Sequence, residues 1–523
     1  MYKKYLFVKV NHSSFEYDVN SVTKAFYPDR QVKVLTPESV SLWQEYQEAT
    51  TQVILEEILI DLKENGAVMT VKAEGRTAEG NMAAKDKRNA GGLMEATYEW
   101  QSTDGTMTEG FDAYKAGFKT FFYQTMEHHT GRSLPWGSLT GIRPTKIAYG
   151  LLEQGKTQEE ILAYLKQKYF VSDEKALLSL DVANRERELL SQIHYQGGYS
   201  LYVGIPFCPT TCLYCSFTSF PIAAYRKKVE AYLDCLIREM KFVSEKYRDK
   251  ILDTVYVGGG TPTTLEPEQL DKLLSNLRRY FDFSKVKEFT VEAGRADSIT
   301  REKLRVLKQY GVSRISVNPQ TMKQKTLDLI GRKASVEQVL EAYRLAREEG
   351  FDNINMDLIL GLPGETASDV QNTIDEVVKL APDSLTVHSL AIKRASKLSD
   401  WILEHGIQTL SNTDETMRIA AEGAKRLGMK PYYLYRQKNM SGNFENVGYA
   451  LPGKFGLYNI LIMEEVQTII ALGAGCISKR VYPDGRIERS DSVKDVSLYL
   501  EKIDEMLDRK EKLMNEMLDR KEN

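Results

Sequence analysis

The sequence predicts an α/β protein organised around a parallel sheet that is closed or nearly closed into a barrel. From residue 199 onward, short apolar runs of strand type alternate with longer helical patterns, as expected of βα units. Glycine-rich and polar motifs follow the predicted strands, at the ends where barrel proteins carry their chemistry. The predicted strands are 201–207, 254–258, 288–292, 313–318, 353–360 and 384–389, and the predicted helices between them are 224–247, 268–280, 300–309, 336–349 and 367–380.

The composition is that of an ordinary globular protein. The chain has 523 residues, of which 42% are hydrophobic and 27% charged, and its mean hydropathy is −0.39. At about 100 to 200 residues per domain, this length predicts two to four domains. A net charge of −3 gives no general attraction to nucleic acid or anionic lipid. No apolar run approaches the roughly 18 residues of a membrane span, and the amino terminus lacks a signal-peptide pattern, so we expect no nucleic-acid partner, no membrane span and a cytoplasmic location.

The first 135 residues predict a small α+β domain without a recognisable catalytic motif. Strand-like runs cover 5–10 and 66–73, whereas the short apolar run 53–63 fits a strand or a helix equally. Aromatic residues at helical spacing predict an amphipathic helix over 113–129. We interpret its aromatic face as core rather than as a ligand site.

A helical linker region is predicted next, over residues 136–198. The run 134–146, which spans the start of this region, holds two glycines, two prolines, a tryptophan and two cations. That composition fits either a segment crossing the mouth of a neighbouring active site or a structural turn. Two helices are then predicted over 157–168 and 172–191, the first opening with a capping box at Thr157.

Three of the five cysteines lie within eight positions, in the spacing C-x3-C-x2-C just after the first predicted barrel strand. Cys208, Cys212 and Cys215 would therefore converge on one tight loop at the carboxyl end of that strand. Thiolates are soft ligands that suit Fe–S clusters or zinc, but a zinc site usually needs a fourth Cys or His. None follows before Cys235, and the nearest earlier histidine is His194, so a cluster with one iron left open is favoured over zinc or three unrelated buried thiols. An odd cysteine count in so long a chain also argues against disulfides and for reduced, metal-bound thiols.

Further polar groups follow the later predicted strands. The glycine-rich run 258–263 lets a ligand approach bare backbone N–H groups, although a flexible turn has the same composition. Glu292 and Asp357 interrupt apolar strands, where a carboxylate needs a partner such as a cofactor group or a cation of the barrel. Gln320 follows the fourth strand, and Arg332, twelve positions later, either offers its planar fork to a carboxylate or simply ends a helix in solvent.

The last part of the chain is less informative. Asp484-Gly485 predicts a hairpin turn, and Cys476 is interpreted as a small buried hydrophobe. A charged helical tail repeats residues 505–511 at 516–522, without a function that we can assign. The predicted organisation is an N-terminal α+β domain, a helical linker region, a barrel and a C-terminal domain, over residues 1–135, 136–198, 199–395 and 396–523.

On these residues the chain resembles the radical S-adenosylmethionine (SAM) enzymes, and among them the oxygen-independent coproporphyrinogen III oxidase family, most of all its HemZ-type coproporphyrinogen dehydrogenase branch. The resemblance covers residues 200 to 390 strongly and extends in part over 400 to 510, and the first two hundred residues match only the HemZ-type branch. The shared stretches are Tyr202 with Ile205-Pro206-Phe207-Cys208, Gly258-Gly259-Gly260-Thr261-Pro262-Thr263, Gln320 with Arg332, and Asp357-Leu358-Ile359 with Gly361-Leu362-Pro363.

The resemblance implies a radical SAM partial (β/α)6 barrel with an N-terminal α+β domain and a C-terminal, mostly helical domain. It also implies that Cys208, Cys212 and Cys215 bind a [4Fe-4S] cluster whose open iron is chelated by SAM. Catalytic roles would fall to Tyr202 and Glu292. The residues implied for cofactor binding are Tyr202, Tyr214, Gly259, Gly260, Thr261, Glu292, Gln320, Arg332, Asp357 and Ala391, the last in a second cofactor position.

The implied activity is the oxidative decarboxylation of two propionates of coproporphyrinogen III to vinyl groups. This reaction gives protoporphyrinogen IX without oxygen, in haem biosynthesis. The implied partners are a porphyrinogen or haem-type tetrapyrrole and a reductant such as flavodoxin or ferredoxin. The aromatic run 432–435 beside Arg436 suits a carboxylated tetrapyrrole, and core packing explains it equally.

Departures from the family pattern bear on the substrate. Gly204 stands where the family has a histidine, and Phe217 stands where the authentic oxidase has a fourth cysteine. The run Cys215-Ser216-Phe217 instead resembles the sister branch that binds and delivers haem. The alternatives are therefore a haem-binding chaperone without decarboxylase activity, or a radical SAM methyltransferase that modifies haem. Arg295, where a proline is common, would either rebuild a loop or supply a cation for a propionate.

Overall fold

The computed structural model describes residues 5–28, 30–39, 41–42, 56–73, 87–88, 94–141, 143–195, 197–393, 396–406, 410, 412–436 and 444–515. Their contacts divide the chain into two compact units. The first comprises Met1–Pro144, Gly150–Leu180 and Gly442–Phe444, and the second comprises Thr145–Tyr149, Asp181–Ser441 and Glu445–Asn523. Among the described helices, none is long and apolar enough to cross a membrane. The finer division into four domains stays a prediction.

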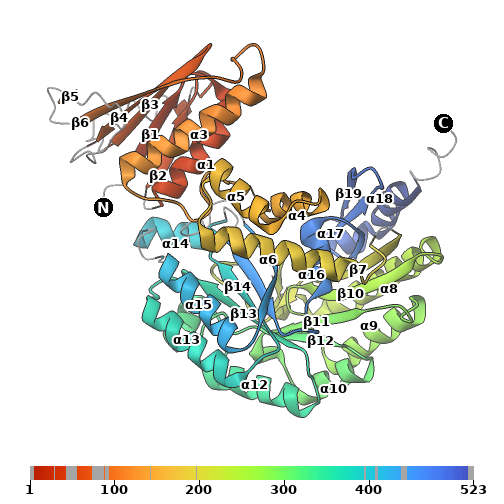
Figure 1. The fold of residues 1–523 in the computed structure, drawn as a ribbon. Coiled ribbons are helices and arrows are strands. Elements are labelled where there is room, and N and C mark those ends of the chain that lie inside the picture. The colour runs from red at the N-terminus through yellow and green to blue at the C-terminus, as the bar shows by residue number, and fades with distance from the viewer. Residues whose placement is uncertain are drawn as a thin grey trace. The chain divides into compact units, whose positions relative to one another are not determined.

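The first unit is built on a six-stranded mixed sheet with the order β2-β1-β3-β4-β6-β5, and helices α1 and α3 lie along one of its faces (Figure 1). Two predicted strands are confirmed as β1 and β4. The run 53–63, which fitted a strand or a helix equally, is a strand from Glu56 on. Residues 53–55 lie outside the described part. The aromatic face of α3 is core, as expected, with Tyr114, Phe118 and Phe122 at most 1% exposed. The bounds are β1 Tyr5–Val10, α1 Glu16–Phe26, β2 Gln31–Leu35, β3 Glu56–Lys63, β4 Gly66–Ala73, β5 Lys87–Arg88, β6 Met94–Gln101 and α3 Phe111–Thr130.

The run that follows α3 begins as a structural turn. Ser138 N donates to Tyr169 O (2.8 Å) and Ser172 N donates to Pro135 O (3.0 Å), so the turn is tied to the connection between two helices. Gly137 has a φ of +53°, and a Cβ there would lie 1.9 Å from Tyr169 O, so only glycine fits. This supports the structural alternative for that segment. The helices are α4 Thr145–Glu153, α5 Gln158–Tyr169, which has the predicted capping box, and α6 Asp173–Leu190.

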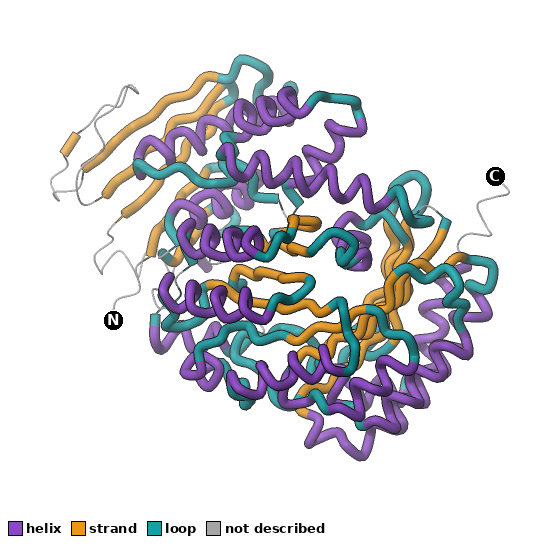
Figure 2. Tube along the Cα trace, turned by 60° about the horizontal axis from the view of Figure 1, so that its bottom comes forward, coloured by secondary structure: helices purple, strands orange, loops and turns teal. Residues whose placement is uncertain are grey.

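The second unit contains the predicted six parallel strands, paired in the order β14-β13-β12-β11-β10-β7, and Figure 2 shows helices outside the strands. Each predicted strand end lies within three residues of the observed one. The predicted helix 224–247 starts later, at Val229, because a short helix and a 3-10 turn precede it. The bounds are β7 Gly198–Ile205, α7 Ile222–Tyr225, α8 Val229–Lys246, β10 Ile251–Gly259, α9 Pro267–Tyr280, β11 Glu288–Gly294, α10 Arg301–Gln309, β12 Arg314–Val317, α11 Gln324–Leu329, α12 Val336–Glu348, β13 Ile354–Leu360, α13 Ala367–Leu380 and β14 Ser384–Ser389.

The residues from 396 onward contribute helices and also extend the barrel sheet at both edges. Strand β16 pairs antiparallel with β14, and β17 pairs parallel with β7, which the sequence did not predict. The predicted hairpin turn joins β18 and β19, with Gly485 at a φ of +81°. The bounds are α14 Leu398–His405, α15 Asp414–Arg426, β15 Lys430–Tyr435, β16 Asn446–Ala450, α16 Leu457–Glu464, β17 Thr468–Leu472, β18 Ile477–Val481, β19 Ile487–Asp491, α17 Val496–Glu501 and α18 Ile503–Asn515.

One buried carboxylate fastens this last part of the chain to the barrel. Glu239 on α8 is fully buried. It accepts hydrogen bonds from Tyr499 OH (2.6 Å) and Gly473 N (2.7 Å), and its other oxygen lies 2.5 Å from Lys510 Nζ. These groups come from α17, the end of β17 and α18, so one carboxylate binds three separate segments of the chain to α8.

Replacing Lys510 with methionine should lower the free energy of unfolding by about 3 to 5 kcal/mol, because it leaves the Glu239 carboxylate buried without its counter-charge. The matched control is Lys512→Met, since Lys512 lies exposed on the same helix. Thermal and urea unfolding of both variants and the parent measure the effect. Equal midpoints for the two variants would contradict the prediction.

Candidate functional site

The cysteine loop is held by its neighbours at the carboxyl end of β7. Strand β8, Phe207–Cys208, pairs with β9, Phe220–Pro221, so the loop leaves and returns at one place. Its middle is tied to the turn after α11, because Leu213 N donates to Ile330 O (2.9 Å) and Thr210 Oγ1 donates to Gly331 O (2.9 Å). The three thiols are free.

Each of the three thiols has a hydroxyl or a guanidinium beside it. The pairs are Cys208 Sγ with Thr261 Oγ1 at 3.4 Å, Cys212 Sγ with Arg295 Nη1 at 3.9 Å and Cys215 Sγ with Ser219 Oγ at 3.8 Å. Burial raises the pKa of the Cys208 and Cys215 thiols, so metal binding has to displace their protons. Donors of this kind are what tune thiolate-bound clusters.

Within the described part of the chain, no three Cys, His, Asp or Glu side chains gather tightly enough to hold one metal ion. The cysteines of an Fe–S cluster bind different irons and stand farther apart than the ligands of a single ion. The loop therefore fits a cluster by its thiol chemistry and its donors.

Next to this loop, the end of β10 presents backbone without side chains. A Cβ on Gly260 would lie 2.5 Å from Phe207 O, and one on Gly258 would lie 3.0 Å from the Glu292 carboxyl group. Glycine is therefore required for the close approach of β10 to the cysteine loop. The space that a side chain would fill at Gly258 lies against a carboxylate.

Glu292 lies inside the barrel on β11 and carries a perturbed carboxyl group. Burial raises its pKa to about 7, and the nearby Asp357 carboxylate adds to the rise, whereas the hydrogen bond from Tyr256 opposes it. Tyr256 OH donates to Glu292 Oε1 at 2.5 Å. The Tyr256 ring stacks on Tyr202 and on Tyr458, with centroids 6.1 Å and 4.4 Å apart. Tyr202 and Glu292, the two residues expected to be catalytic, are thus joined through Tyr256.

The segments that follow β12 and α11 carry buried polar atoms without partners among the described residues. Gln320 adopts a φ of +69°, and its backbone bridges to β13 through N to Asp357 O (2.9 Å). Arg332 donates to Asn318 O and to Tyr214 OH, the latter at 3.3 Å. Among the described residues, Gln320 Oε1, Asn318 Oδ1 and Arg332 Nε are buried without a hydrogen-bond partner. A strained backbone with unsatisfied polar atoms is typical of a ligand site.

Asp357 has partial partners on its own side of the barrel. Asn355 Nδ2 donates to Asp357 Oδ1 at 2.6 Å, and His388 Nε2 lies 4.0 Å from Oδ2. His388 is therefore the cation of the barrel that the described contacts place nearest to Asp357, and both alternatives for this carboxylate stay open. Ala391 lies half-buried after the end of β14, and its role stays a prediction.

The structure therefore brings most of the predicted site residues to one end of the parallel strands. Sequence reasoning missed Tyr256, Ser219 and Tyr458. Tyr256 was discoverable, because it lies two positions before the glycine run on β10 and so faces the same side as Gly258. Tyr458 was not, since α16 is distant in sequence.

Two departures from the family pattern have structural explanations. A Cβ on Gly204 would lie 2.3 Å from Cys476 Sγ, so this buried thiol fills the space beside the glycine. Burial raises the pKa of Cys476 to about 12, in agreement with a small buried hydrophobe. Arg295 is paired with Asp297 and bonded to Thr210, which favours the loop-building alternative over a free cation for a propionate.

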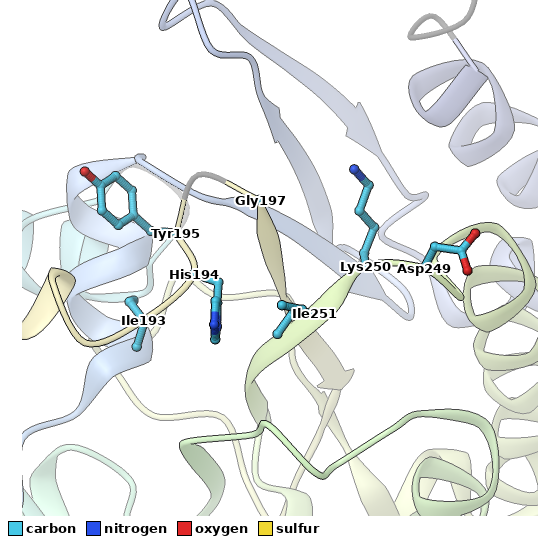
Figure 3. Close-up of a pocket in the computed structure, with 7 residues that line it drawn as sticks. All are labelled: Ile193, His194, Tyr195, Gly197, Asp249, Lys250 and Ile251. Atoms are coloured by element: carbon cyan, nitrogen blue, oxygen red, sulfur yellow. The ribbon is translucent and has the colours of Figure 1, made fainter.

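A separate shallow pocket lies at the opposite, amino-terminal ends of β7 and β10 (Figure 3). His194 is held there by Asp253, with Nδ1 and Oδ1 3.0 Å apart. The pocket is lined by Ile193, His194, Tyr195, Gly197, Asp249, Lys250 and Ile251. None of these belongs to the cysteine loop or to the strand ends described above.

Comparison with known proteins agrees with this geometry. The model of the radical SAM superfamily matches residues 202–377. The oxygen-independent coproporphyrinogen-III oxidase-like protein HemZ of Bacillus subtilis is 41% identical over 82% of this chain and 87% of its own length. The haem chaperone HemW of Bacillus subtilis is 38% identical over 37% of this chain and 51% of its own. The oxygen-independent coproporphyrinogen III oxidase of Salmonella typhimurium is 28% identical over 58% of this chain and 65% of its own.

The Glu292→Gln variant should change how stability depends on pH. Between pH 4.5 and about 7 the folded parent keeps a proton that the unfolded chain releases, so its stability falls as the pH rises through that window. Glutamine removes this loss, which is at most about 3 kcal/mol at 1.36 kcal/mol per pKa unit. Thermal unfolding at pH 5 and pH 8, without added cofactors, should show a larger gain for the variant at pH 8 than at pH 5.

The control is Glu341→Gln, because Glu341 is exposed on α12. If the parent and Glu292→Gln lose the same stability between pH 5 and pH 8, the assignment of a raised Glu292 pKa is wrong.

Proposed function

Because the chain belongs to the radical SAM superfamily, and within it to the coproporphyrinogen-III oxidase-like family of HemZ, we propose that it oxidatively decarboxylates the propionates of coproporphyrinogen III to vinyl groups, giving protoporphyrinogen IX. The proposal rests on one observation. At the ends of the adjacent parallel strands β7 and β10, the three-cysteine loop contacts the bare backbone of the glycine run. The glycine backbone in turn lies against Glu292. No oxygen enters the reaction.

Cys208, Cys212 and Cys215 would hold a [4Fe-4S] cluster. SAM would lie on Gly259, Gly260, Thr261, Glu292, Gln320, Arg332 and Asp357, with Tyr202 and Tyr214 nearby. When bound, the reduced cluster and SAM supply the radical that takes hydrogen from a propionate side chain. Gln320 Oε1 and Arg332 Nε have no partner among the described residues, which supports this placement because a zwitterionic amino-acid group offers both a donor and a carboxylate.

The protein's own groups prepare this end of the barrel for such chemistry. The rings of Tyr202, Tyr256 and Tyr458 stack on one another and form an aromatic surface beside Glu292. Glu292, with a pKa of about 7 raised by burial, can accept a hydrogen bond from an ammonium group or hold a proton near neutral pH. The Tyr256 hydroxyl fixes the direction in which that carboxyl group points.

A second candidate function, haem binding and delivery, is favoured by one specific observation. Phe217, at the position of the oxidase's fourth cysteine, is 77% exposed beside the cysteine loop. A large exposed aromatic suits contact with a flat macrocycle or with a partner protein. The similarity to the haem chaperone HemW adds to this candidate.

One anaerobic assay separates the two functions. Protein reconstituted with iron and sulfide, and supplied with SAM, a reductant and coproporphyrinogen III, should release carbon dioxide and form protoporphyrinogen IX, detected by chromatography. Formation of 5′-deoxyadenosine without decarboxylated product would refute the oxidase function. Stable one-to-one haem binding in the same preparation would then favour delivery.

The cluster assignment has its own test. Cys212→Ala should lower the iron bound after reconstitution by at least about half, because an Fe–S cluster needs each of its thiolate ligands. Cys235→Ala is the matched control, since Cys235 lies on α8 away from the loop. Iron and sulfide per chain are measured for both. Full iron in Cys212→Ala would show that the loop is not the cluster site.

A further inference from the structure

We propose that Arg295 is a positioning residue that raises the reduction potential of the cluster held by the three-cysteine loop. The inference rests on the cluster assigned under the proposed function, but it does not depend on the substrate. It concerns a residue that stands where proline is common in the family, so it describes a property of this chain's own site.

The Arg295 side chain contacts the cysteine loop from the end of β11. It follows β11 directly and is only 4% exposed. Its Nη1 donates to Thr210 O at 3.0 Å and to Thr210 Oγ1 at 2.7 Å, and lies 3.9 Å from Cys212 Sγ. Thr210 and Cys212 are both in the loop, so one nitrogen of the guanidinium serves its backbone and one of its thiols.

The guanidinium is fixed from the other side by a carboxylate. Asp297 Oδ1 accepts from Nε at 3.0 Å and Oδ2 accepts from Nη2 at 2.6 Å, which is a two-pronged ion pair. A buried arginine held in this way has little freedom to swing out toward a substrate. Its Nη1 atom is therefore held beside the Cys212 sulfur.

The three thiols differ in the kind of neighbour they have. The side-chain partner of the Cys208 sulfur is the Thr261 hydroxyl and that of the Cys215 sulfur is the Ser219 hydroxyl, whereas that of the Cys212 sulfur is the Arg295 guanidinium. The charge of Arg332 interacts with both Cys212 and Cys215, so Arg295 is the cation that distinguishes Cys212. Reduction adds one negative charge to a cluster, so a donor and a positive charge near a ligand sulfur favour the reduced state.

The carboxylate of Asp297 works in the opposite direction, because its negative charge offsets part of the guanidinium's. Removing the guanidinium should therefore make the cluster harder to reduce, and neutralising Asp297 should make it easier. A residue that only braced the loop would not produce shifts of opposite sign. Loss of a brace would instead lower the amount of cluster in both variants.

The experiment uses the full chain with its reconstituted cluster, without SAM or substrate. Arg295→Gln, Asp297→Asn and the control Arg344→Gln, which lies exposed on α12, are titrated with dithionite and redox dyes. The reduced cluster is measured by electron paramagnetic resonance. Iron and sulfide per chain are measured in parallel.

In Arg295→Gln the ratio of reduced to oxidised cluster at a fixed potential should fall about tenfold, which is about 59 mV for one electron. In Asp297→Asn the ratio should rise, and in Arg344→Gln it should not change. Unchanged potentials in the first two variants, or shifts of the same sign, would overturn the inference while leaving the cluster and the proposed function standing.

Two further outcomes are also decisive. If Arg295→Gln holds no cluster, the same titration is run on Arg295→Lys and Asp297→Asn. A higher ratio of reduced to oxidised cluster in Asp297→Asn then supports the inference, and an unchanged ratio overturns it. If the parent itself binds no iron, the cluster assignment fails and the inference falls with it. That result is distinguishable from a cluster that is present but insensitive to Arg295.

Discussion

Two backbone hydrogen bonds between the ends of β7 and β10 hold together the parts on which the site depends. Gly260 N donates to Ile205 O at 2.8 Å and Thr261 N donates to Phe207 O at 2.7 Å. They bring the bare glycine backbone against the start of the cysteine loop, and they place the Thr261 hydroxyl beside Cys208 Sγ. Any side chain at Gly260 would collide with Phe207 O, so this contact requires its glycine.

Two carboxyl groups and two guanidinium groups lie at this end of the barrel. Two carboxyl groups, Glu292 and Asp357, project from the strands, while two guanidinium groups, Arg295 and Arg332, lie near Cys212. One arginine is fully engaged by an aspartate, and the other keeps a buried nitrogen without a partner among the described residues. The two guanidinium groups therefore differ in how fully the described residues satisfy them.

Local sequence patterns predicted the parallel strands and most of their crossover helices, because the apolar residues of each element repeat with a regular period over several positions. The cysteine spacing and the glycine run also located one end of the barrel. What escaped prediction depends on contacts between distant residues. Strand β17 is five residues long and pairs with β7 across more than 250 positions, and Tyr458 reaches the Tyr256 ring from α16. Likewise, nothing in the local sequence of Arg295 shows that its partners are Thr210 and Cys212.

The pairing of β17 with β7 has a consequence for how the protein is made. The strand that leads into the cysteine loop has β10 on one side, but its other edge stays open until residues 468–472 have been synthesised. The groups that fasten this edge to α8 come still later, at Tyr499 and Lys510. During translation the loop cysteines therefore leave the ribosome long before the sheet around them is complete. Until then, the strand that leads into the loop has a sheet partner on one side only.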